Sequence, residues 1–414
     1  MTGGWSLVVP PPAWDELCRH LFADGGRHAA VLLAERAFGP RGPRLLVRDL
    51  VRAADGLHYA RGTHDYRSLR AEFLRDTAVR ARDAGLAHLV VRGSPDADFG
   101  PVELASHERG FPALSAIVGD SIGAVVIAGD GPPDAANGPG SLAHVAGDLW
   151  HPGGDRTGLA ELVVPGAALL RLRSAPEAPP RLRVAVVGLG GTGTAIAGLL
   201  ARTNVVSELV LVDHRPADDH LLPRSPAART DDVGVPRVEV AARAAVRHRN
   251  VTIVPVGCAV TSPVARAALA GCDWIFLADP AHAARHQVND VVHRYLVPAT
   301  QVGVAGVADP HVVVRALRPG RACLWCEGLV EHARLAADVP GTPADRADAG
   351  LFVGLDALAA AEAVTQFLIA VGHAPEGGVG VTVDHVLHRP AARSRHLVRP
   401  RHRKDCRACR PARI

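Results

Sequence analysis

A run of glycines lies where a hydrophobic strand is expected to pass into a helix. The segment GLGGTG, residues 188–193, contains Gly188, Gly190, Gly191 and Gly193. Residues without side chains let backbone N–H groups and a helix N-terminus approach a phosphate closely, where the helix dipole favours negative charge. Asp213 lies 20 residues after Gly193, at the end of the next expected strand, and is placed to hold ribose hydroxyls. The pattern predicts a nucleotide site; a turn that serves only tight packing is the alternative.

Four cysteines form two Cys-x-x-Cys pairs, Cys323 with Cys326 and Cys406 with Cys409. Four thiolates complete a tetrahedral shell around Zn²⁺, and each pair supplies two of them at a suitable spacing. We therefore expect a closed, structural zinc site that joins the C-terminal tail to the domain before it. Four unrelated thiols or a redox pair are the alternatives.

The composition is that of a globular protein with a marked preference for arginine. The chain has 414 residues, of which 48% are hydrophobic and 21% charged, enough for two or three domains with sizeable cores. Of its 46 lysine and arginine residues only Lys404 is a lysine, which leaves 45 arginines. Any phosphate site inside the fold must therefore use arginine.

Charge and hydropathy exclude two classes of partner. A net charge of +4 spread over this length predicts no nucleic-acid surface. The exception is an arginine-rich tail over 389–413, which could contact RNA or an acidic partner, with a solvated terminus as the alternative. The uncharged stretch Val184–Ala201 contains clustered glycines, which suits a strand, turn and helix better than a membrane span. The N-terminus lacks a secretory signal pattern, so a cytoplasmic location is expected.

Strands and helices alternate in the second half of the chain. Expected strands are Val184–Val187, Leu209–Val212, Thr252–Pro255 and Trp274–Ala278, and expected helices are Thr194–Arg202, Arg237–His248, Pro263–Ala270 and Ala284–Tyr295. This order predicts an α/β fold with a Rossmann-like, doubly wound, mostly parallel sheet.

The first part of the chain predicts a smaller mixed α/β domain. Its expected helices are Trp14–Phe22 and Ser68–Ala84, and its expected strands are Ala29–Ala34, Leu45–Val51, His88–Arg92 and Ala124–Ala128. Taking Pro/Gly-rich stretches as boundaries, we expect a domain over 1–130, a linker and arm over 131–180, and the nucleotide domain with its zinc knuckle over 181–414.

A segment after the strand ending at Ala278 resembles a family signature. Residues 279–290, DPAHAARHQVND, are similar to the Asp-Asn-x-x-x-Arg-x-x-x-Asn segment of the ThiF/MoeB and ubiquitin-activating enzyme superfamily, with one extra residue between Asp279 and Arg285. The resemblance extends through residues 297–300 and both cysteine pairs, and covers over half the chain. It implies an ATP-dependent adenylyltransferase.

The resemblance assigns roles to individual residues. It implies that the glycine loop binds ATP phosphates, that Asp213 binds ribose and that Asp279 holds Mg²⁺, for which a carboxylate is a suitable hard ligand. Arg224 matches the arginine of the family's Asn-Leu-x-Arg-Gln segment and would grip the β and γ phosphates. Arg285 and Asn289 would support the loop of Asp279, with a helix-face arginine and a structural cap as the alternatives.

Departures from the family pattern accompany these matches. Leu221 and Ser225 replace the Asn and Gln around Arg224, and Arg237 replaces a family lysine, keeping the charge with a bulkier group. The family also uses an arginine from an N-terminal arm, often across a homodimer, and Arg156 is the candidate for that role. An exposed loop arginine is the alternative.

The N-terminal part resembles a JAB/MPN isopeptidase domain in its order of elements. That metalloprotease needs His-x-His-Pro followed by Ser and Asp, whereas residues 92–95 here read RGSP, with Gly100 and Glu103 near the later positions. Without the two histidines a catalytic zinc lacks its ligands. We therefore expect a degenerate, non-catalytic scaffold or recognition domain.

Three functions are compatible with these observations. The first is adenylation of the C-terminal carboxylate of a peptide or a small ubiquitin-like or sulfur-carrier protein, without a thioester cysteine, since residues 327–405 contain no cysteine. The second is a ThiF-like pseudoenzyme that binds a peptide in natural-product biosynthesis. The third, an NAD-dependent oxidoreductase, fits the glycine loop but neither Asp279–Asn289 nor the cysteine pairs.

Overall fold

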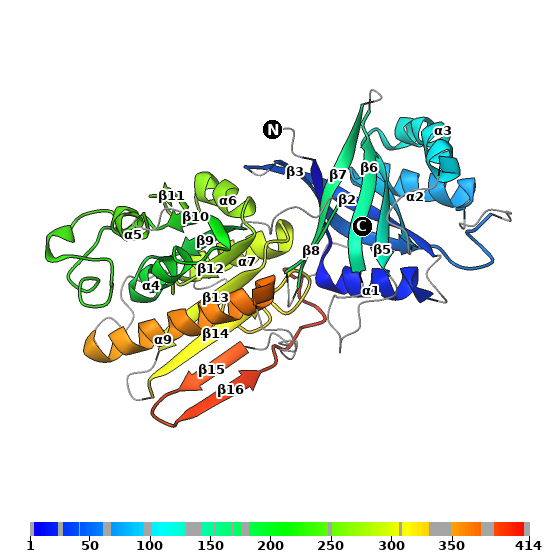
Figure 1. Ribbon diagram of the computed structural model, residues 1–414. Helices are drawn as coiled ribbons and strands as arrows, with labels where there is room; N and C mark the ends of the chain where they lie inside the picture. Colours follow the sequence, from blue (N-terminus) through cyan, green and yellow to red (C-terminus); the bar gives the residue numbers. More distant parts are fainter. Residues whose placement is uncertain are drawn as a thin grey trace. The chain divides into compact units, whose positions relative to one another are not determined.

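The chain forms two units, Met1–Ala178 and Pro179–Arg410, each with its own sheet (Figure 1). The computed structural model describes residues 4–23, 28–40, 42–60, 68–94, 101–129, 142–152, 155–166, 169–174, 182–246, 251–305, 309–330, 349–373 and 385–409. The expectation for the Pro/Gly-rich stretch 131–140 therefore lies outside the described residues.

The first unit is built on a sheet that closes on itself. Its strand order is β1-β3-β2-β4-β5-β6-β7-β8, and β1 pairs in parallel with both β3 and β7. The strands are β1 (Trp5–Val8), β2 (Ala29–Gly39), β3 (Gly42–Arg52), β4 (Ala87–Ser94), β5 (Ile122–Gly129), β6 (Leu142–Trp150), β7 (Arg156–Pro165) and β8 (Leu169–Arg173). The helices are α1 (Pro11–Leu21), α2 (Ala71–Ala84) and α3 (Pro101–Val118).

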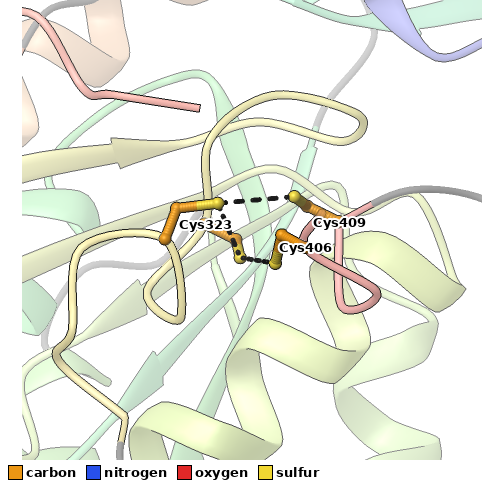
Figure 2. A group of neighbouring side chains, drawn as sticks. Cys323, Cys406 and Cys409 are labelled. Atoms are coloured by element: carbon orange, nitrogen blue, oxygen red, sulfur yellow. Dashed lines mark hydrogen bonds between the residues drawn. The ribbon is translucent and has the colours of Figure 1, made fainter. Parts of the chain in front are cut away.

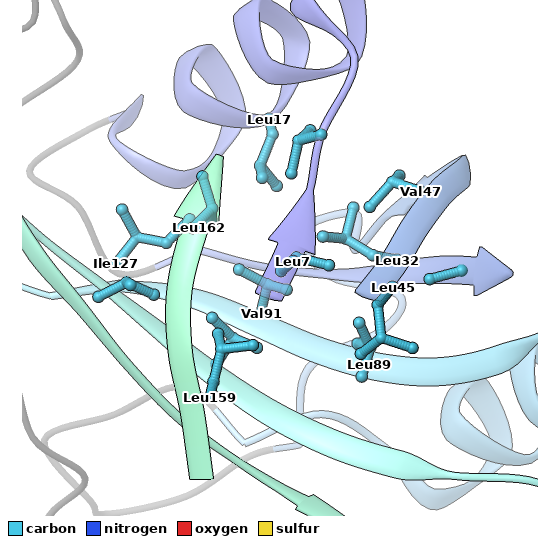
Figure 3. Close-up of a cluster of buried hydrophobic side chains, with 14 of the residues drawn as sticks. Leu7, Leu17, Leu32, Leu45, Val47, Leu89, Val91, Ile127, Leu159 and Leu162 are labelled. Atoms are coloured by element: carbon cyan, nitrogen blue, oxygen red, sulfur yellow. The ribbon is translucent and has the colours of Figure 1, made fainter. Parts of the chain in front are cut away.

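Both faces of this sheet are buried, as β2 shows. Ala30, Leu32 and Ala34 join a core with Leu17 of α1, part of which Figure 3 shows. The residues that alternate with them, Ala29, Val31 and Leu33, join a second core with side chains of α2 and α3. Because successive side chains of a strand point to opposite faces, a continuous apolar run is the expected sequence of a strand covered on both sides.

The linker predicted for 131–180 is wrong for its described part. Strands β6, β7 and β8 pair with one another and extend the first sheet from β5. Leu159, Leu162 and Val164 of β7 are buried in its core. Gly147 serves close strand contact rather than a loop, because a Cβ there would lie 2.8 Å from the Ala124 carbonyl oxygen.

The second unit confirms the predicted Rossmann-like fold. Its strand order is β11-β10-β9-β12-β13-β14-β15-β16, parallel from β11 to β13 and antiparallel from there to β16. The strands are β9 (Leu182–Val187), β10 (Val206–Val212), β11 (Thr252–Val256), β12 (Trp274–Leu277), β13 (Ala299–Ala305), β14 (His311–Leu317), β15 (His385–Arg389) and β16 (Ser394–Val398). The helices are α4 (Gly191–Leu200), α5 (Arg237–Ala245), α6 (Pro263–Ala270), α7 (His282–Arg294) and α9 (Ala349–Leu368).

Three parallel strands end at one edge and set the position of the polar loops. Val187 of β9 pairs with Val212 of β10 and with Leu277 of β12, so these three strands stop at the same level. Gly188, Asp213 and Asp279 follow them directly or after one residue. The carboxyl ends of parallel strands are where doubly wound sheets bind ligands.

In the part of the chain that the structure describes, one helix is long and apolar enough to cross a membrane by length and composition. It is the stretch Phe352–Val371, which includes most of α9. In the structure α9 packs against α4, β13 and β14. Its side chains Phe352, Ala359, Ala363 and Phe367 are buried there. The apolar composition of this helix is thus accounted for by its place in the core of the second unit.

Candidate nucleotide cavity and cysteine cluster

The glycine loop packs so closely that Gly188, Gly191 and Gly193 are sterically required. Gly188 has a φ of +85°, and a Cβ on it would lie 2.7 Å from the Asp279 backbone nitrogen. A Cβ on Gly193 would lie 1.8 Å from the Gly188 carbonyl oxygen. Gly190 precedes the first residue of α4, Gly191, so the helix N-terminus and its free N–H groups face the end of β9. The predicted strand–turn–helix is confirmed.

A cavity of about 300 Å³ opens beside this loop. Its described lining includes Gly190, Gly191 and Thr192 of the loop, together with backbone and side chains of β13 and β14. Five arginines also line it, Arg215, Arg224, Arg237, Arg285 and Arg315. None of the described lining residues is an aspartate or glutamate. The wall therefore presents guanidinium groups and helix N–H groups, an arrangement suited to an anion with several charges.

Arg224 is held by a carboxylate that the sequence did not point to. Asp356 of α9 accepts hydrogen bonds from Arg224 Nε at 2.9 Å and Nη2 at 3.1 Å, and it also accepts one from the Thr192 hydroxyl. The Asp356 side chain is 2% exposed. Arg224 also lies over the Phe352 ring, 5.2 Å from its centroid. The signal in the sequence was an acid in a mostly apolar helix, where Glu362 is the other charged residue.

The departures beside Arg224 have structural roles of their own. Leu221 packs in a small core with Ala217 and Val240, where an asparagine side chain would be buried without water. The Ser225 hydroxyl accepts a hydrogen bond from the Ala227 N–H at 3.2 Å. Both residues thus stabilise the turn that carries Arg224.

Asp213 and Asp279 are both bound by Arg215. Asp213 accepts from Arg215 Nε and Nη2 at 2.9 and 2.8 Å and from the Leu189 and Arg215 N–H groups at 2.7 and 2.9 Å. Asp279 Oδ2 accepts from Arg215 Nη2 at 2.9 Å, and Asp279 Oδ1 accepts from the Ala281 N–H at 2.9 Å. Sequence reasoning missed Arg215, although it lies two residues after Asp213.

The electrostatics of this trio follow from its bonding. Burial alone would raise the pKa of Asp213, but the hydrogen bonds from Arg215 and the two backbone amides outweigh it and lower the pKa. Burial opposes the charge of Arg215, but the hydrogen bonds to Asp213 and the charges of Asp279 and Asp213 raise its pKa above the usual value. Asp213 and Arg215 are therefore both ionised at neutral pH.

The resemblance implies Mg²⁺ at Asp279, and the contacts of this residue do not fit that role. Both carboxylate oxygens already accept hydrogen bonds, and the donor on Oδ2 is a cation. Likewise Asp213 offers the ribose only oxygens that Arg215 and two backbone amides already contact.

Arg237 lies in the cavity wall, as expected of a phosphate-binding group. Its Nε donates to the Pro216 carbonyl at 3.0 Å and its Nη2 to Asp218 Oδ2 at 3.0 Å. The Asp218 side chain is 49% exposed, so this carboxylate is much more accessible to water than Asp356, which holds Arg224.

Arg285 of α7 and Arg315 of β14 line the part of the cavity next to β13. Arg315 donates to Gln301 Oε1 at 2.6 Å and is paired with Glu327 at 3.3 Å. Burial and the nearby charge of Arg285 lower the pKa of Arg315, and Glu327 opposes them. Glu327 directly follows Cys326, so it links the cysteine cluster to the cavity wall.

Asn289 does not line the cavity in the described part of the chain. Its side-chain oxygen accepts a hydrogen bond from the Leu324 N–H at 2.9 Å, inside the first cysteine pair. The expected support of the Asp279 loop is thus replaced by a contact that connects α7 to the cysteine cluster.

The four predicted cysteines converge. Cys323 Sγ lies 3.7 Å from Cys326 Sγ and 3.6 Å from Cys406 Sγ, and Cys326 Sγ lies 3.6 Å from Cys409 Sγ (Figure 2). All four sulfurs lie within 4.8 Å of one another. A tetrahedral zinc site with bonds of about 2.3 Å places its sulfurs roughly 3.8 Å apart, so the cluster has suitable dimensions for a metal ion.

Arg156, the expected arm arginine, belongs to β7 of the first unit. It is paired with Glu108 and Asp148, each at 3.3 Å, and lies over the Trp150 ring. Arg156 thus has its ion pairs and its ring contact within the first unit.

The isopeptidase-like positions of the first unit hold an ion pair. Arg92 Nε donates to Glu103 Oε1 at 2.6 Å, and the Glu103 side chain is buried. Burial raises the pKa of Glu103, and the charge of Arg92 opposes this. Gly100 lies outside the described residues.

The family model given below aligns with the second unit of the chain. The model of the ThiF family matches residues 177–407. The chain is 32% identical over 181 residues to the SAMP-activating enzyme E1 of Haloferax volcanii, an alignment that covers 42% of this chain and 63% of that enzyme.

Among solved structures, the chain is similar to E. coli MccB with ATP, with a TM-score of 0.44, 19% identity, and coverage of 55% of this chain and 66% of that one. It is also similar to the microcin C7 biosynthetic enzyme MccB in complex with N-formylated MccA, with a TM-score of 0.43, 19% identity, and coverage of 55% and 67%. The chain thus spans slightly less than two thirds of the SAMP-activating enzyme and about two thirds of MccB.

Proposed function

The chain belongs to the ThiF family, and on this premise we propose that it is an ATP-dependent adenylyltransferase. Its substrate would be the C-terminal carboxylate of a peptide or of a small ubiquitin-like or sulfur-carrier protein. The observation that carries the proposal is the cavity at the glycine loop, whose described wall holds five arginines and no carboxylate. A cytoplasmic homodimer is part of the same proposal.

In this mechanism the chain's own groups bind and neutralise the triphosphate. The N–H groups at the start of α4 face the phosphates, and Arg224, held in place by Asp356, contacts the terminal ones. A substrate carboxylate oxygen attacks the α-phosphorus, the bond from that phosphorus to the bridging oxygen breaks, and pyrophosphate leaves with its charge balanced by arginines. The carboxylate becomes an acyl-adenylate.

The reaction would end at the adenylate or pass to an external nucleophile. No cysteine is among the described residues that line the cavity. Cys272 of this unit is buried, which raises its pKa to about 12 and keeps it a thiol. The four clustered cysteines would hold a structural Zn²⁺, which would stabilise the fold around Glu327 and α7.

Pyrophosphate exchange into ATP tests the proposal, with candidate acceptor peptides supplied as free acids and as C-terminal amides. We expect exchange only with the free acids. Arg224→Gln should lower its rate about 100-fold, since this arginine balances charge on the leaving group. Arg202→Gln, an exposed arginine at the end of α4, is the matched control. Exchange supported equally by the amides would contradict the proposal.

One observation favours a second function, a ThiF-like pseudoenzyme that binds a peptide in natural-product biosynthesis. Arg215 contacts the carboxylates of Asp213 and Asp279, which the resemblance assigns to ribose and metal. Calorimetry separates the two functions, because a pseudoenzyme of this kind should bind its peptide and not ATP.

A further inference from the structure

Arg215 lies between the two carboxylates at the end of the parallel strands. It contacts Asp213 through two nitrogens and Asp279 through Nη2. Its side chain is one-third exposed and lines the cavity, whereas the Asp213 side chain is fully buried behind it. The member of this trio that lines the cavity is therefore the cation, Arg215.

A divalent ion at Asp279 would be placed beside this guanidinium. Mg²⁺ binds carboxylate oxygens at about 2.1 Å and keeps a near-octahedral shell of oxygen ligands. Because Arg215 Nη2 lies 2.9 Å from Asp279 Oδ2, an ion on that oxygen would lie at most about 5 Å from Nη2. Two cations at that separation repel each other, and the second Asp279 oxygen already accepts the Ala281 N–H.

The rest of the described wall supplies the charge that a metal would bring. Arg224, Arg237, Arg285 and Arg315 line the same cavity as Arg215. The acids that pair with Arg224, Arg237 and Arg315 are Asp356, Asp218 and Glu327, and they are absent from the described lining. An unmetallated triphosphate, with about four negative charges, would meet guanidinium groups and helix N–H groups.

We propose that this cavity binds the nucleoside triphosphate without a divalent metal, with Arg215 as the cation beside Asp279. The inference rests on the proposed function, since it concerns how the same cavity takes ATP. Arg215 acts here as a binding residue, and Asp279 as the group that positions it together with Asp213.

The test is ATP binding to the full chain by isothermal titration calorimetry, in excess Mg²⁺ and in excess EDTA, after the zinc content has been shown to be equal in both. We expect the two dissociation constants to agree within about twofold. Arg215→Gln should weaken binding in EDTA about tenfold and make it respond to Mg²⁺. Arg202→Gln is the matched control.

Asp279→Asn provides a second test that keeps Arg215. A metal-free site and a magnesium site predict opposite changes of ATP affinity in this variant. Arg215 keeps both bonds to Asp213 in this variant, while one negative charge beside the phosphates is lost. ATP affinity in EDTA should therefore rise about threefold, whereas loss of a magnesium ligand would lower affinity in Mg²⁺. Asp290→Asn on α7 is the matched control, because Asp290 is not among the described lining residues.

Two results would overturn the inference and are distinguishable. Binding that requires Mg²⁺, or that falls in Asp279→Asn, would refute the metal-free site and leave adenylation standing. An absence of ATP binding in both buffers by the folded wild-type chain would refute the proposed function as well. Thermal unfolding of each variant shows whether it is folded, and Asp279→Asn, which keeps Arg215, decides the question if Arg215→Gln is not folded.

Discussion

The cysteine cluster and the Asp213–Asp279 pair both bring metal-type donors together in the second unit, and they differ in what lies among the donors. The four sulfurs contact one another at distances compatible with one shared ion. The two carboxylates contact Arg215 instead. Donors of suitable type at suitable spacing therefore indicate a metal site only when the protein has not placed a cation of its own among them.

The largest expected effect is on the cysteine side of this comparison. Cys409→Ser should reduce bound zinc from about one per chain to a small fraction and lower the thermal midpoint of the second unit by roughly 10 °C or more, because structural zinc contributes directly to folding. Metal analysis and calorimetric unfolding measure this. Cys258→Ser, outside the cluster, is the control, and equal zinc loss in both variants would contradict the assignment.

A somewhat smaller effect is expected where a carboxylate holds an arginine of the cavity. Asp356→Ala leaves the partly buried Arg224 and the Thr192 hydroxyl without this acceptor, and should lower the free energy of unfolding by about 3 kcal/mol. Urea unfolding measures it. Glu362→Ala on the same helix removes a more exposed pair with Arg395 and should cost under about 1 kcal/mol. Similar losses of unfolding free energy in the two variants would show that burial does not make the Arg224–Asp356 pair stronger than the Arg395–Glu362 pair.

As pH falls, the cysteine cluster should respond before the pairing of Asp213 with Arg215. The pKa of Asp213 lies below its ordinary value of 3.8, so its pairing stabilises the folded state fully above that pH and loses this effect only as pH falls further. Protons compete with Zn²⁺ for the thiolates, and because the ordinary thiol pKa is about 8.5, zinc affinity begins to fall at a much higher pH than a carboxylate titrates. As pH falls, zinc release, followed with a chromogenic chelator, should therefore occur before the free energy of unfolding loses the part that depends on Asp213. That part is identified by its absence in Asp213→Asn. The reverse order would contradict the comparison.

The smallest effect is expected at the solvent-exposed pair of Arg237 with Asp218. Asp218→Asn removes the partner of Arg237, but the carboxylate is about half exposed and its charge is screened by water. The free energy of unfolding should change by less than about 0.5 kcal/mol, measured by urea unfolding beside Asp356→Ala. A change as large as that of Asp356→Ala would mean that Arg237 depends on this bond.

Local pattern was sufficient for the elements of the second unit from β9 to α7, whereas β13, β14, α9, β15 and β16 were not predicted. The expected helix Pro263–Ala270 is found with the same bounds, and strands and helices near the glycine loop differ by a few residues at their ends. It was insufficient for β6 to β8, because the glycines and prolines around them have the composition of a linker. The pairing of β7 with β1, at the start of the chain, depends on the tertiary structure.

The sequence by itself determined the Rossmann-like order of elements, the glycine loop and the two cysteine pairs, since each depends on residues that are neighbours along the chain. Only the tertiary structure decided which charges meet. Asp356 lies 164 residues from Thr192 and 132 from Arg224, and Asp279 lies 64 residues from Arg215. Such pairs form because α9 packs on α4 and because parallel strands end at one level. No local periodicity records that packing, so the charge of the cavity wall could be established only from the folded chain.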